Sequence, residues 1–120
     1  MSKEIINKAQ RGEIYLAWFS KKSVGTEVRK TKPVLIISSN WQNEVSKRII
    51  VLPLSTKVAK IYDPAELYIG KISGEEEESK IMCDQIKSID KKRLIKKLAS
   101  LSDNLMIEVV ERLKELLELY

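Results

Sequence analysis

Two short apolar runs separated by a polar segment constrain the fold of this chain more than any other feature. The runs are Val34–Ile37 and Ile49–Leu52, and they contain only leucine and β-branched residues. Each run is too short for a helix core, whereas such residues suit strands that are buried on both faces. Lys32 stands just before the first run, and Ser55 and Thr56 follow the second. The stretch predicts two buried strands that display a cation and two hydroxyls at their ends.

The chain around these runs alternates short apolar segments with polar ones, as in a sheet of short strands. Residues 20–31 are polar and contain Gly25, so we expect a long, mobile loop there. The polar segment 38–47 suits a surface loop or a short helix, in which Trp41 packs against the protein. The acidic run Glu75–Glu78 predicts a solvated hairpin tip. The expected strands are residues 13–19, 33–38, 48–54, 66–69, 81–89 and 97–101, with a helical turn at 90–94.

Two of these strands contain a residue that is unusual for its position. Pro53 has no N–H to donate, so we expect the strand 48–54 to end there, at an edge or bulge. In the strand 81–89, alternation places Asp84 on the same face as Met82 and Ile86. A carboxylate buried between apolar neighbours would need a hydrogen-bond or charge partner.

The last segment of the chain has the spacing of an amphipathic helix. After Ser102 or Asp103 as N-cap, apolar residues form one stripe, and Glu108 precedes Arg112 by four residues, as Lys114 precedes Glu118. The whole pattern predicts a mostly β (α+β) fold, a small, mostly antiparallel barrel or curled sheet with a C-terminal α-helix laid on it. We expect one domain over residues 1–120, with a lead-in at 1–10, the barrel at 11–101 and the helix at 103–119.

Composition excludes several classes of site. The 120 residues contain one cysteine, Cys83, and no histidine, which excludes an internal disulfide, a multi-cysteine metal site and every Ser-His or Cys-His pair. Cys83 is expected to be a small core residue in a reducing compartment. No apolar run approaches the length of a membrane span, and the start of the chain lacks the pattern of a signal peptide. The net charge of +5 favours a polyanionic or acidic partner, although a lysine-rich surface alone would also explain it.

Four motifs occur in order along the chain: Arg11–Tyr15 (RGEIY), Lys32–Ile37 (KPVLII), Leu52–Thr56 (LPLST) and Cys83–Asp90 (CDQIKSID). Together with the terminal helix they resemble the MazF/PemK family of toxin endoribonucleases, over about residues 11–118. The resemblance implies an SH3-like antiparallel barrel that forms a homodimer in the cytoplasm and binds single-stranded RNA in grooves at the dimer interface. It implies cleavage at short sequence motifs without a metal or other cofactor. It also implies a cognate antitoxin whose tail covers the groove.

The residues permit this chemistry. RNA supplies its own nucleophile, the 2′-hydroxyl, so the protein must take up that proton, stabilise the phosphorane and protonate the leaving 5′-oxygen. The products are a 2′,3′-cyclic phosphate and a 5′-hydroxyl, and neither a histidine nor a metal is required in principle.

The resemblance implies roles for particular residues. Lys32 would stabilise the phosphorane and act as the acid, and Ser55, helped by Thr56, would donate a hydrogen bond to a phosphate oxygen. Glu27, in the segment Gly25-Thr26-Glu27, and Asp84 are the candidate bases. The RNA-binding residues implied in addition are Arg29, Lys30 and Thr31.

The chain departs from the family pattern at positions that carry chemistry. Lys32 and Ser55 stand where the family usually has arginine and threonine, and Met82 stands where one branch has a second arginine. Lysine lacks the planar fork with which arginine grips phosphate. A second interpretation is therefore a weakened or inactive barrel of the same superfamily that binds RNA or protein. The gyrase-poisoning CcdB toxins share the fold, but they rely on a tryptophan near the C-terminus, where this chain ends Leu-Glu-Leu-Tyr.

Overall fold

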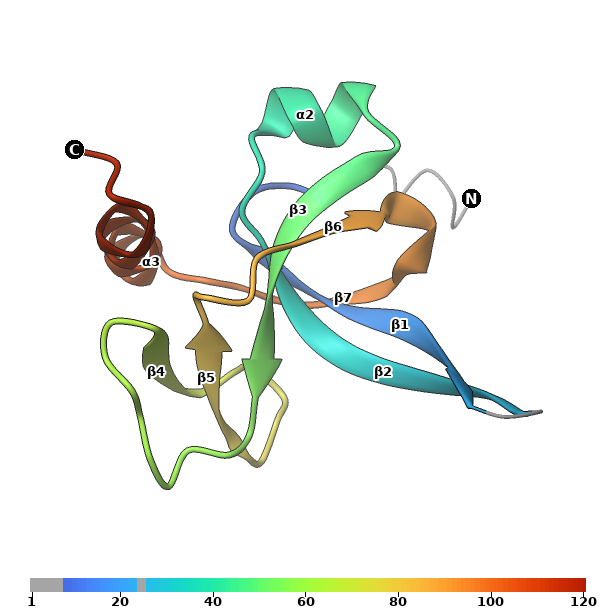
Figure 1. Cartoon of the computed structure of the whole chain (residues 1–120), viewed down its shortest axis with the longest axis horizontal. Coiled ribbons are helices and arrows are strands. Elements are labelled where there is room, and N and C mark those ends of the chain that lie inside the picture. The colour runs from blue at the N-terminus through green and yellow to red at the C-terminus, as the bar shows by residue number, and fades with distance from the viewer. Residues whose placement is uncertain (1–7, 24–25) are drawn as a thin grey trace.

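The structure, a computed structural model, describes residues 8–23 and 26–120, and it describes side chains for residues 8–19 and 30–120. Within those ranges the chain forms a curled, half-open antiparallel sheet with one long helix at its C-terminal end (Figure 1). The path through the sheet is β4-β5-β3-β2-β1-β7, and β6 pairs with β3 beside that path. The elements are β1 (Glu13–Ser23), β2 (Thr26–Ile36), α2 (Asn40–Val45), β3 (Arg48–Ser55), β4 (Glu66–Lys71), β5 (Glu78–Met82), β6 (Lys87–Asp90), the 3-10 helix η1 (Lys91–Arg93), β7 (Leu94–Ser100) and α3 (Asp103–Leu117). The predicted mostly β fold with a C-terminal helix is confirmed.

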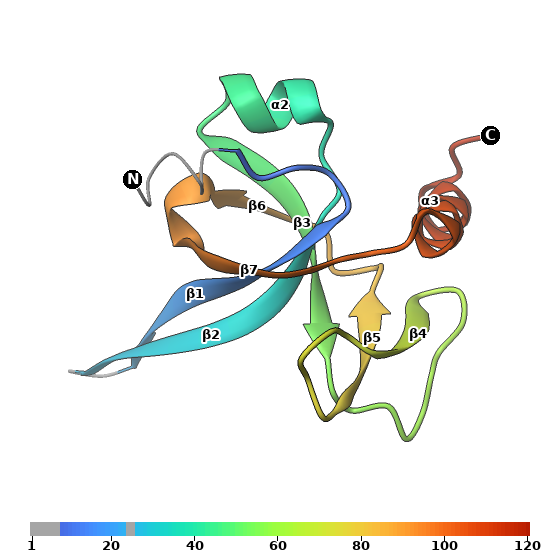
Figure 2. The same cartoon turned by 180° about the vertical axis from the view of Figure 1, so that it is seen from behind.

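The prediction of a long, mobile loop at residues 20–31 is wrong. β1 and β2 pair continuously from Ile14 opposite Leu35 to Ser23 opposite Thr26, so residues 20–23 and 26–31 form the outer part of a long hairpin. Figures 1 and 2 show the hairpin extending away from the rest of the sheet, and Figure 2 also shows β7 alongside β1. These polar residues have no apolar face that would bury them. Hydrogen bonds between the two strands hold them extended, because the pairing continues outward from the buried part of the same strands.

β3 is the strand around which the sheet curls. It pairs with β2 through Val51–Pro53, with β6 through Arg48–Val51 and with β5 through Leu54 and Ser55. Pro53 therefore does not end the strand as predicted. It lies buried at the last pair with β2, and β3 runs two residues further to pair with β5. A residue without an N–H fits the point where a strand changes partners.

The strand expected at 81–89 is divided in two. β5 pairs with β4 and with the end of β3, whereas β6 pairs with the beginning of β3, so the chain must turn between them. The turn contains Cys83–Ile86, and the Gln85 N–H donates to the Met82 carbonyl at 3.1 Å. Asp84 is therefore exposed on a turn, and it does not lie on an apolar strand face.

Apolar side chains form two clusters on the two sides of the curled sheet. Cys83 is fully buried in one cluster, as predicted, together with Val109 of α3. This cluster consists of Ile14, Leu35, Leu52, Leu54, Leu67, Ile72, Ile81, Cys83 and Val109. The other consists of Ala9, Tyr15, Ala17, Val34, Ile36, Ile49, Val51, Ile89 and Leu94, with Phe19 packed against it.

The helices confirm most of the predicted features. α3 has Ser102 as its N-cap and an Arg112–Glu108 ion pair, but it ends at Leu117 because Glu118 takes a left-handed conformation (φ 55°). The predicted partner of Lys114, Glu118, lies beyond the end of the helix, and Lys114 pairs with Glu111 at 3.6 Å. A short helix, α2, follows β2, yet its Trp41 is 71% exposed, so the expected packing of that ring is wrong. No helix among the described residues is long and apolar enough to cross a membrane.

Candidate functional site

The two apolar runs place Lys32 and Ser55 on the same face of the sheet. Val34 of β2 lies opposite Pro53 of β3 at the last pair between these strands. Lys32 is two residues before Val34 and Ser55 is two residues after Pro53, and side chains two residues apart in a strand share a face. Beyond this pair β3 leaves β2 and pairs with β5 (Figure 1). By register, Lys32 and Ser55 therefore flank the point where β2 and β3 diverge.

Lys32 and Ser55 each have bonding capacity for a ligand. Lys32 is exposed, and within the described part of the chain no side chain or carbonyl forms a hydrogen bond or ion pair with its ammonium. Ser55 is half-buried, and its Oγ accepts a hydrogen bond of 3.1 Å from the Lys57 N–H. That bond uses only a lone pair of the oxygen, so the hydroxyl hydrogen can still donate to an anion.

Further cations gather on this face beside aromatic rings. Lys30 lies opposite Phe19, and the Lys87 ammonium lies 5.4 Å from the centre of the Phe19 ring. We call the surface defined by Lys30, Lys32, Ser55 and Lys87 the cationic face. Because like charges repel unless an anion lies between them, such a surface favours a polyanionic ligand.

Next to the cationic face is a hollow of about 550 Å³. Its wall includes Phe19, and the Arg93 guanidinium lies 4.8 Å from the ring of the neighbouring Trp18. Sequence reasoning missed this cluster, although the adjacent aromatics of β1 were a usable signal. The hollow is lined by Phe19, Arg48, Lys87, Ser88, Ile89, Asp90 and Arg93.

The remaining predicted site residues are dispersed. Asp84 is exposed on the turn before β6, and no described group forms a hydrogen bond or ion pair with its carboxylate. Thr31 alternates with Lys30 and Lys32, so it projects from the other face of β2. Thr56 is exposed just after β3. The backbones of Glu27 and Arg29 lie in β2, but their side chains are outside the described residues.

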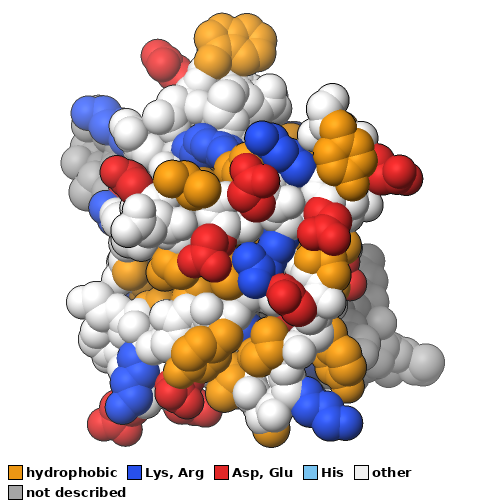
Figure 3. Space-filling view, turned by 90° about the vertical axis from the view of Figure 1, so that its left-hand side faces the viewer, with side chains coloured by type: hydrophobic (Ala, Val, Ile, Leu, Met, Phe, Trp, Pro, Cys, Tyr) orange, Lys and Arg blue, Asp and Glu red, His pale blue; other side chains and the backbone are white. Residues whose placement is uncertain are grey.

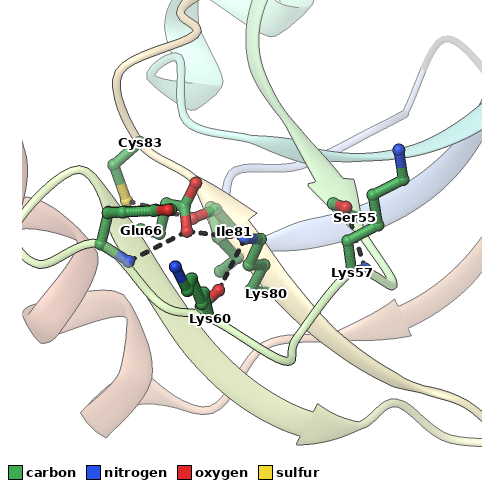
Figure 4. Close-up of polar contacts among 8 residues, drawn as sticks. Ser55, Lys57, Lys60, Glu66, Lys80, Ile81 and Cys83 are labelled. Atoms are coloured by element: carbon green, nitrogen blue, oxygen red, sulfur yellow. Dashed lines mark hydrogen bonds and ion pairs between the residues drawn. The ribbon is translucent and has the colours of Figure 1, made fainter.

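A buried ion pair lies next to Ser55, and sequence reasoning did not find it. Lys80 of β5 is the register partner of Ser55, and its ammonium lies 2.6 Å from the carboxylate of Glu66 in β4 (Figure 4). The two side chains are 7% and 10% exposed. The hydrogen bond from Lys80 lowers the pKa of Glu66 below its ordinary value, although burial opposes this shift. The carboxylate is therefore held in its charged form.

The same pair also binds the backbone of the segment 56–65, between β3 and β4. The Lys80 ammonium donates to the Lys60 carbonyl at 3.0 Å, and the Tyr62 N–H donates to the Glu66 carboxylate at 3.0 Å. From the other side, Arg112 of α3 donates to the Asp63 carboxylate at 2.8 Å. These bonds attach an irregular segment to the sheet and to the helix.

Cys83 is an unreactive core residue in this setting. Burial raises the pKa of its thiol to about 11, which the nearby Arg112 lowers only in part. Its Sγ lies 3.9 Å from the Ile81 carbonyl (Figure 4). In residues 8–23 and 26–120, no three His, Cys, Asp or Glu side chains lie close enough together to hold a metal ion.

The face that carries α3 and β4 differs from the cationic face. Figure 3 shows apolar, basic and acidic side chains interspersed on it. The ion pairs of α3 contribute to this mixture, since both Arg112 and Lys114 have acidic partners on the same helix. On this face, the positive charges of Arg112 and Lys114 are therefore offset by acidic neighbours.

Comparison with known proteins finds similarity to toxins of toxin–antitoxin systems. Residues 10–117 match the model of the family described as PemK-like, MazF-like toxin of type II toxin-antitoxin system. Endoribonuclease EndoA of Bacillus subtilis (strain 168) is 36% identical over 106 residues, which are 88% of this chain and 90% of that protein.

Solved structures agree with this result at the level of the fold. The MazE-MazF structure (Form-II) from Deinococcus radiodurans has a TM-score of 0.78 at 23% identity, covering 94% of this chain and 98% of the matched one. An endoribonuclease in complex with its cognate antitoxin, from a mycobacterial species, has a TM-score of 0.69 at 21% identity, covering 93% and 95%.

Proposed function

Because this chain belongs to the PemK-like, MazF-like family of type II toxin–antitoxin toxins, we propose that it cleaves single-stranded RNA at the cationic face. It is a toxin endoribonuclease, as family membership and the likeness to EndoA indicate. The finer proposal is a metal-independent reaction that leaves a 2′,3′-cyclic phosphate and a 5′-hydroxyl.

The observation that carries the proposal is the shared face of Lys32 and Ser55, where the two strands diverge. In the reaction the 2′-oxygen forms a bond to phosphorus as its proton leaves, and the bond to the 5′-oxygen breaks as that oxygen gains a proton. The Lys32 ammonium is an exposed donor that stabilises charge on the phosphorane oxygens and can protonate the leaving oxygen. The Ser55 hydroxyl donates to a phosphate oxygen while the Lys57 N–H orients it.

We assign the base to Glu27 or Asp84, and binding of neighbouring phosphates to Arg29, Lys30, Thr31 and Thr56. Of these, Lys30 has the strongest structural support, because it shares a strand face with Lys32. Asp84 would have to reach the RNA from the exposed turn that precedes β6.

Family membership supports a proposal about the partners and the location. We propose that a cognate antitoxin inhibits the protein, that the protein is a homodimer and that it acts in the cytoplasm. Structurally similar MazF toxins are known bound to MazE, which supports the first point. An acidic antitoxin segment would complement the cationic face, and so would compete with RNA for the same charges.

A non-catalytic RNA-binding or protein-binding role is the second candidate. One observation favours it: Lys32 is exposed, and no described carboxylate contacts it to complete an acid–base pair. Such a protein would bind RNA through the same cations without cleaving the RNA strand.

A cleavage assay separates these two roles. Wild-type protein, Ser55→Ala and the control Ser73→Ala, an exposed serine between β4 and β5, are incubated with a long single-stranded RNA in excess EDTA. We expect discrete fragments that end in cyclic phosphate, and a rate about 100-fold lower for Ser55→Ala only, because a transition-state donor is lost. RNA that is bound but intact would favour the second candidate, and cleavage only after adding divalent cations would contradict the proposed reaction.

A further inference from the structure

The buried Lys80–Glu66 pair does more than join two strands. A charge taken out of water loses hydration, which is regained only if its hydrogen-bonding groups find partners. Here the partners extend beyond the pair itself, because Lys80 also donates to the Lys60 carbonyl and Glu66 also accepts from the Tyr62 N–H. Both additional bonds go to the backbone of the segment 56–65. The pair therefore acts as a clamp on that segment.

The clamped segment has a surface suited to a single-stranded nucleic acid. It follows Ser55 directly, and it exposes Lys57, Lys60, Ile61 and Tyr62 to solvent. The Tyr62 side chain is 59% exposed, which is a large area for an aromatic ring with no ligand bound. Cations beside an exposed ring match the two needs of single-stranded RNA, namely phosphate neutralisation and base stacking.

Apart from the clamp, this segment is attached mainly at its end near β4, where Arg112 donates to Asp63 and the Cys83 N–H donates to the Ala65 carbonyl. It contains no helix or strand, and it begins at the solvent-exposed Thr56. The pair fixes the Lys60 carbonyl (Figure 4) and the Tyr62 N–H, so it holds the backbone on which the exposed Tyr62 ring stands. A binding surface that is ordered in advance avoids the entropy cost of ordering it when a ligand arrives.

We propose that Lys80 and Glu66 are positioning residues that hold the segment 56–65 as an RNA-binding surface next to Ser55. The bound group is a nucleotide of the RNA strand adjacent to the scissile phosphate, stacked on Tyr62 and neutralised by Lys57 or Lys60. This inference rests on the proposed RNA cleavage. It predicts that the buried pair acts on substrate affinity and on the choice of cleavage position, and leaves the chemical step itself almost unchanged.

The decisive variant is the double substitution Lys80→Met with Glu66→Leu. Buried ion pairs can often be replaced by apolar residues of similar volume without loss of stability, whereas the two bonds to the segment disappear. The matched control is Lys114→Met with Glu111→Leu, which removes an exposed ion pair on α3. Glu66→Gln serves as the conservative variant, because its amide oxygen can still accept from Tyr62 and from Lys80.

Three measurements are made on each protein: the thermal midpoint, hydrogen exchange of the Tyr62 amide, and KM, kcat and cleavage positions on a long single-stranded RNA. For the apolar double variant we expect a midpoint near that of the wild type and faster exchange at Tyr62. We expect KM to rise about tenfold, with kcat nearly constant and with cleavage spread over more positions. Glu66→Gln and the α3 control should retain the wild-type KM and pattern.

The inference and the proposed function can fail separately. If wild-type protein cleaves RNA and the apolar double variant cleaves it with the same KM at the same positions, the inference is overturned and the endonuclease activity stands. If wild-type protein does not cleave, filter binding of the same RNA decides: weaker binding by the double variant supports the clamp. Equal binding, or no binding by either protein, overturns it.

Discussion

At the scale of single residues, the position of each charge determines what it can do. Lys32 is exposed at a strand edge and can approach a phosphate, but as a lysine it is a point charge without the bidentate geometry of arginine. Lys80 is a lysine of the same chain that is buried and already bonded to Glu66 and to Lys60. Lys32 can therefore bind a ligand, whereas Lys80 stabilises the fold through its bonds to Glu66 and Lys60.

The Glu66 carboxylate should make the free energy of unfolding depend on pH in the acidic range. Because the hydrogen bond from Lys80 lowers its pKa in the folded state, this group stabilises the fold fully above its unfolded-state pKa of about 4.5. The contribution is lost as the pH falls through the lower folded-state pKa. We expect the free energy of unfolding of the wild type, relative to Lys80→Met/Glu66→Leu, to decrease as the pH falls below about 4.5. Urea unfolding at a series of pH values measures it, and a constant difference would contradict the assigned pair.

The Cys83 thiol should be inert in the native protein. Burial raises its pKa to about 11, so almost no thiolate exists near about pH 8, and reagents would also have to enter the core. We expect an aromatic disulfide reagent to leave the native thiol unmodified and to react with one equivalent in denaturant. Equal reaction rates in the two states would show that Cys83 is not in the core.

Part of the candidate site could be predicted from single residues and their spacing. Lys32 and Ser55 flank two adjacent apolar runs, and antiparallel pairing of those runs necessarily brings their ends together. Asp84 could not be placed in the same way, because the predicted strand 81–89 is divided into β5 and β6, and Asp84 lies on the turn between them. Glu66 and Lys80 resemble surface residues in the sequence, and only the pairing of β4 with β5 shows that they meet inside the protein.

At the scale of elements, the periodic spacing of apolar residues predicted helices and buried strands, whereas the pairing of strands through the backbone leaves no mark in the sequence. The stripe of α3 predicted its buried face, and the strand β3 was predicted to within one residue. The outer half of the β1–β2 hairpin was missed, because residues 20–23 and 26–31 are mostly polar and owe their extended form to cross-strand hydrogen bonds. The break between β5 and β6 was missed because it depends on which part of β3 each one pairs with.

The two sides of α3 should respond differently to truncation. Val109 is fully buried in the cluster under the helix, whereas Ile107 on the same helix is 60% exposed. We expect Val109→Ala to reduce the free energy of unfolding by about 2 kcal/mol, because it removes apolar contacts and leaves a cavity. Ile107→Ala should change it by less than about 0.5 kcal/mol. Urea denaturation measures both, and equal losses would contradict the packing of the helix.

At the scale of the whole molecule, a net charge of +5 is modest, but its distribution matters more than its sum. Lys30, Lys32 and Lys87 share one face, while the face of α3 mixes both signs (Figure 3). RNA should therefore bind in one orientation, along the divergence of β2 and β3, and a competing acidic segment should bind there too.

This distribution predicts the salt dependence of RNA binding. Three phosphate contacts would give a slope of about −2 for the logarithm of the association constant against the logarithm of salt concentration. Lys87→Gln should reduce the magnitude of the slope by about 0.7, whereas Lys96→Gln, an exposed lysine of β7, should leave it unchanged. Titration of a 2′-O-methylated RNA, which has no nucleophile, measures binding alone. An equal reduction of the slope by Lys87→Gln and Lys96→Gln would mean that RNA binds without preference for the cationic face.

The most direct test of the central claim is the single-turnover rate of RNA cleavage in excess EDTA by wild type, Lys32→Ala, Lys32→Arg and the control Lys96→Ala. We expect Lys32→Ala to be slower by about 100-fold to 1,000-fold, because it removes the donor that stabilises the phosphorane. Lys32→Arg should match or exceed the wild type, the control should be unchanged, and every fragment should end in a cyclic phosphate. Cleavage by Lys32→Ala at the wild-type rate would contradict the account, since the chemistry would then lie elsewhere on the molecule.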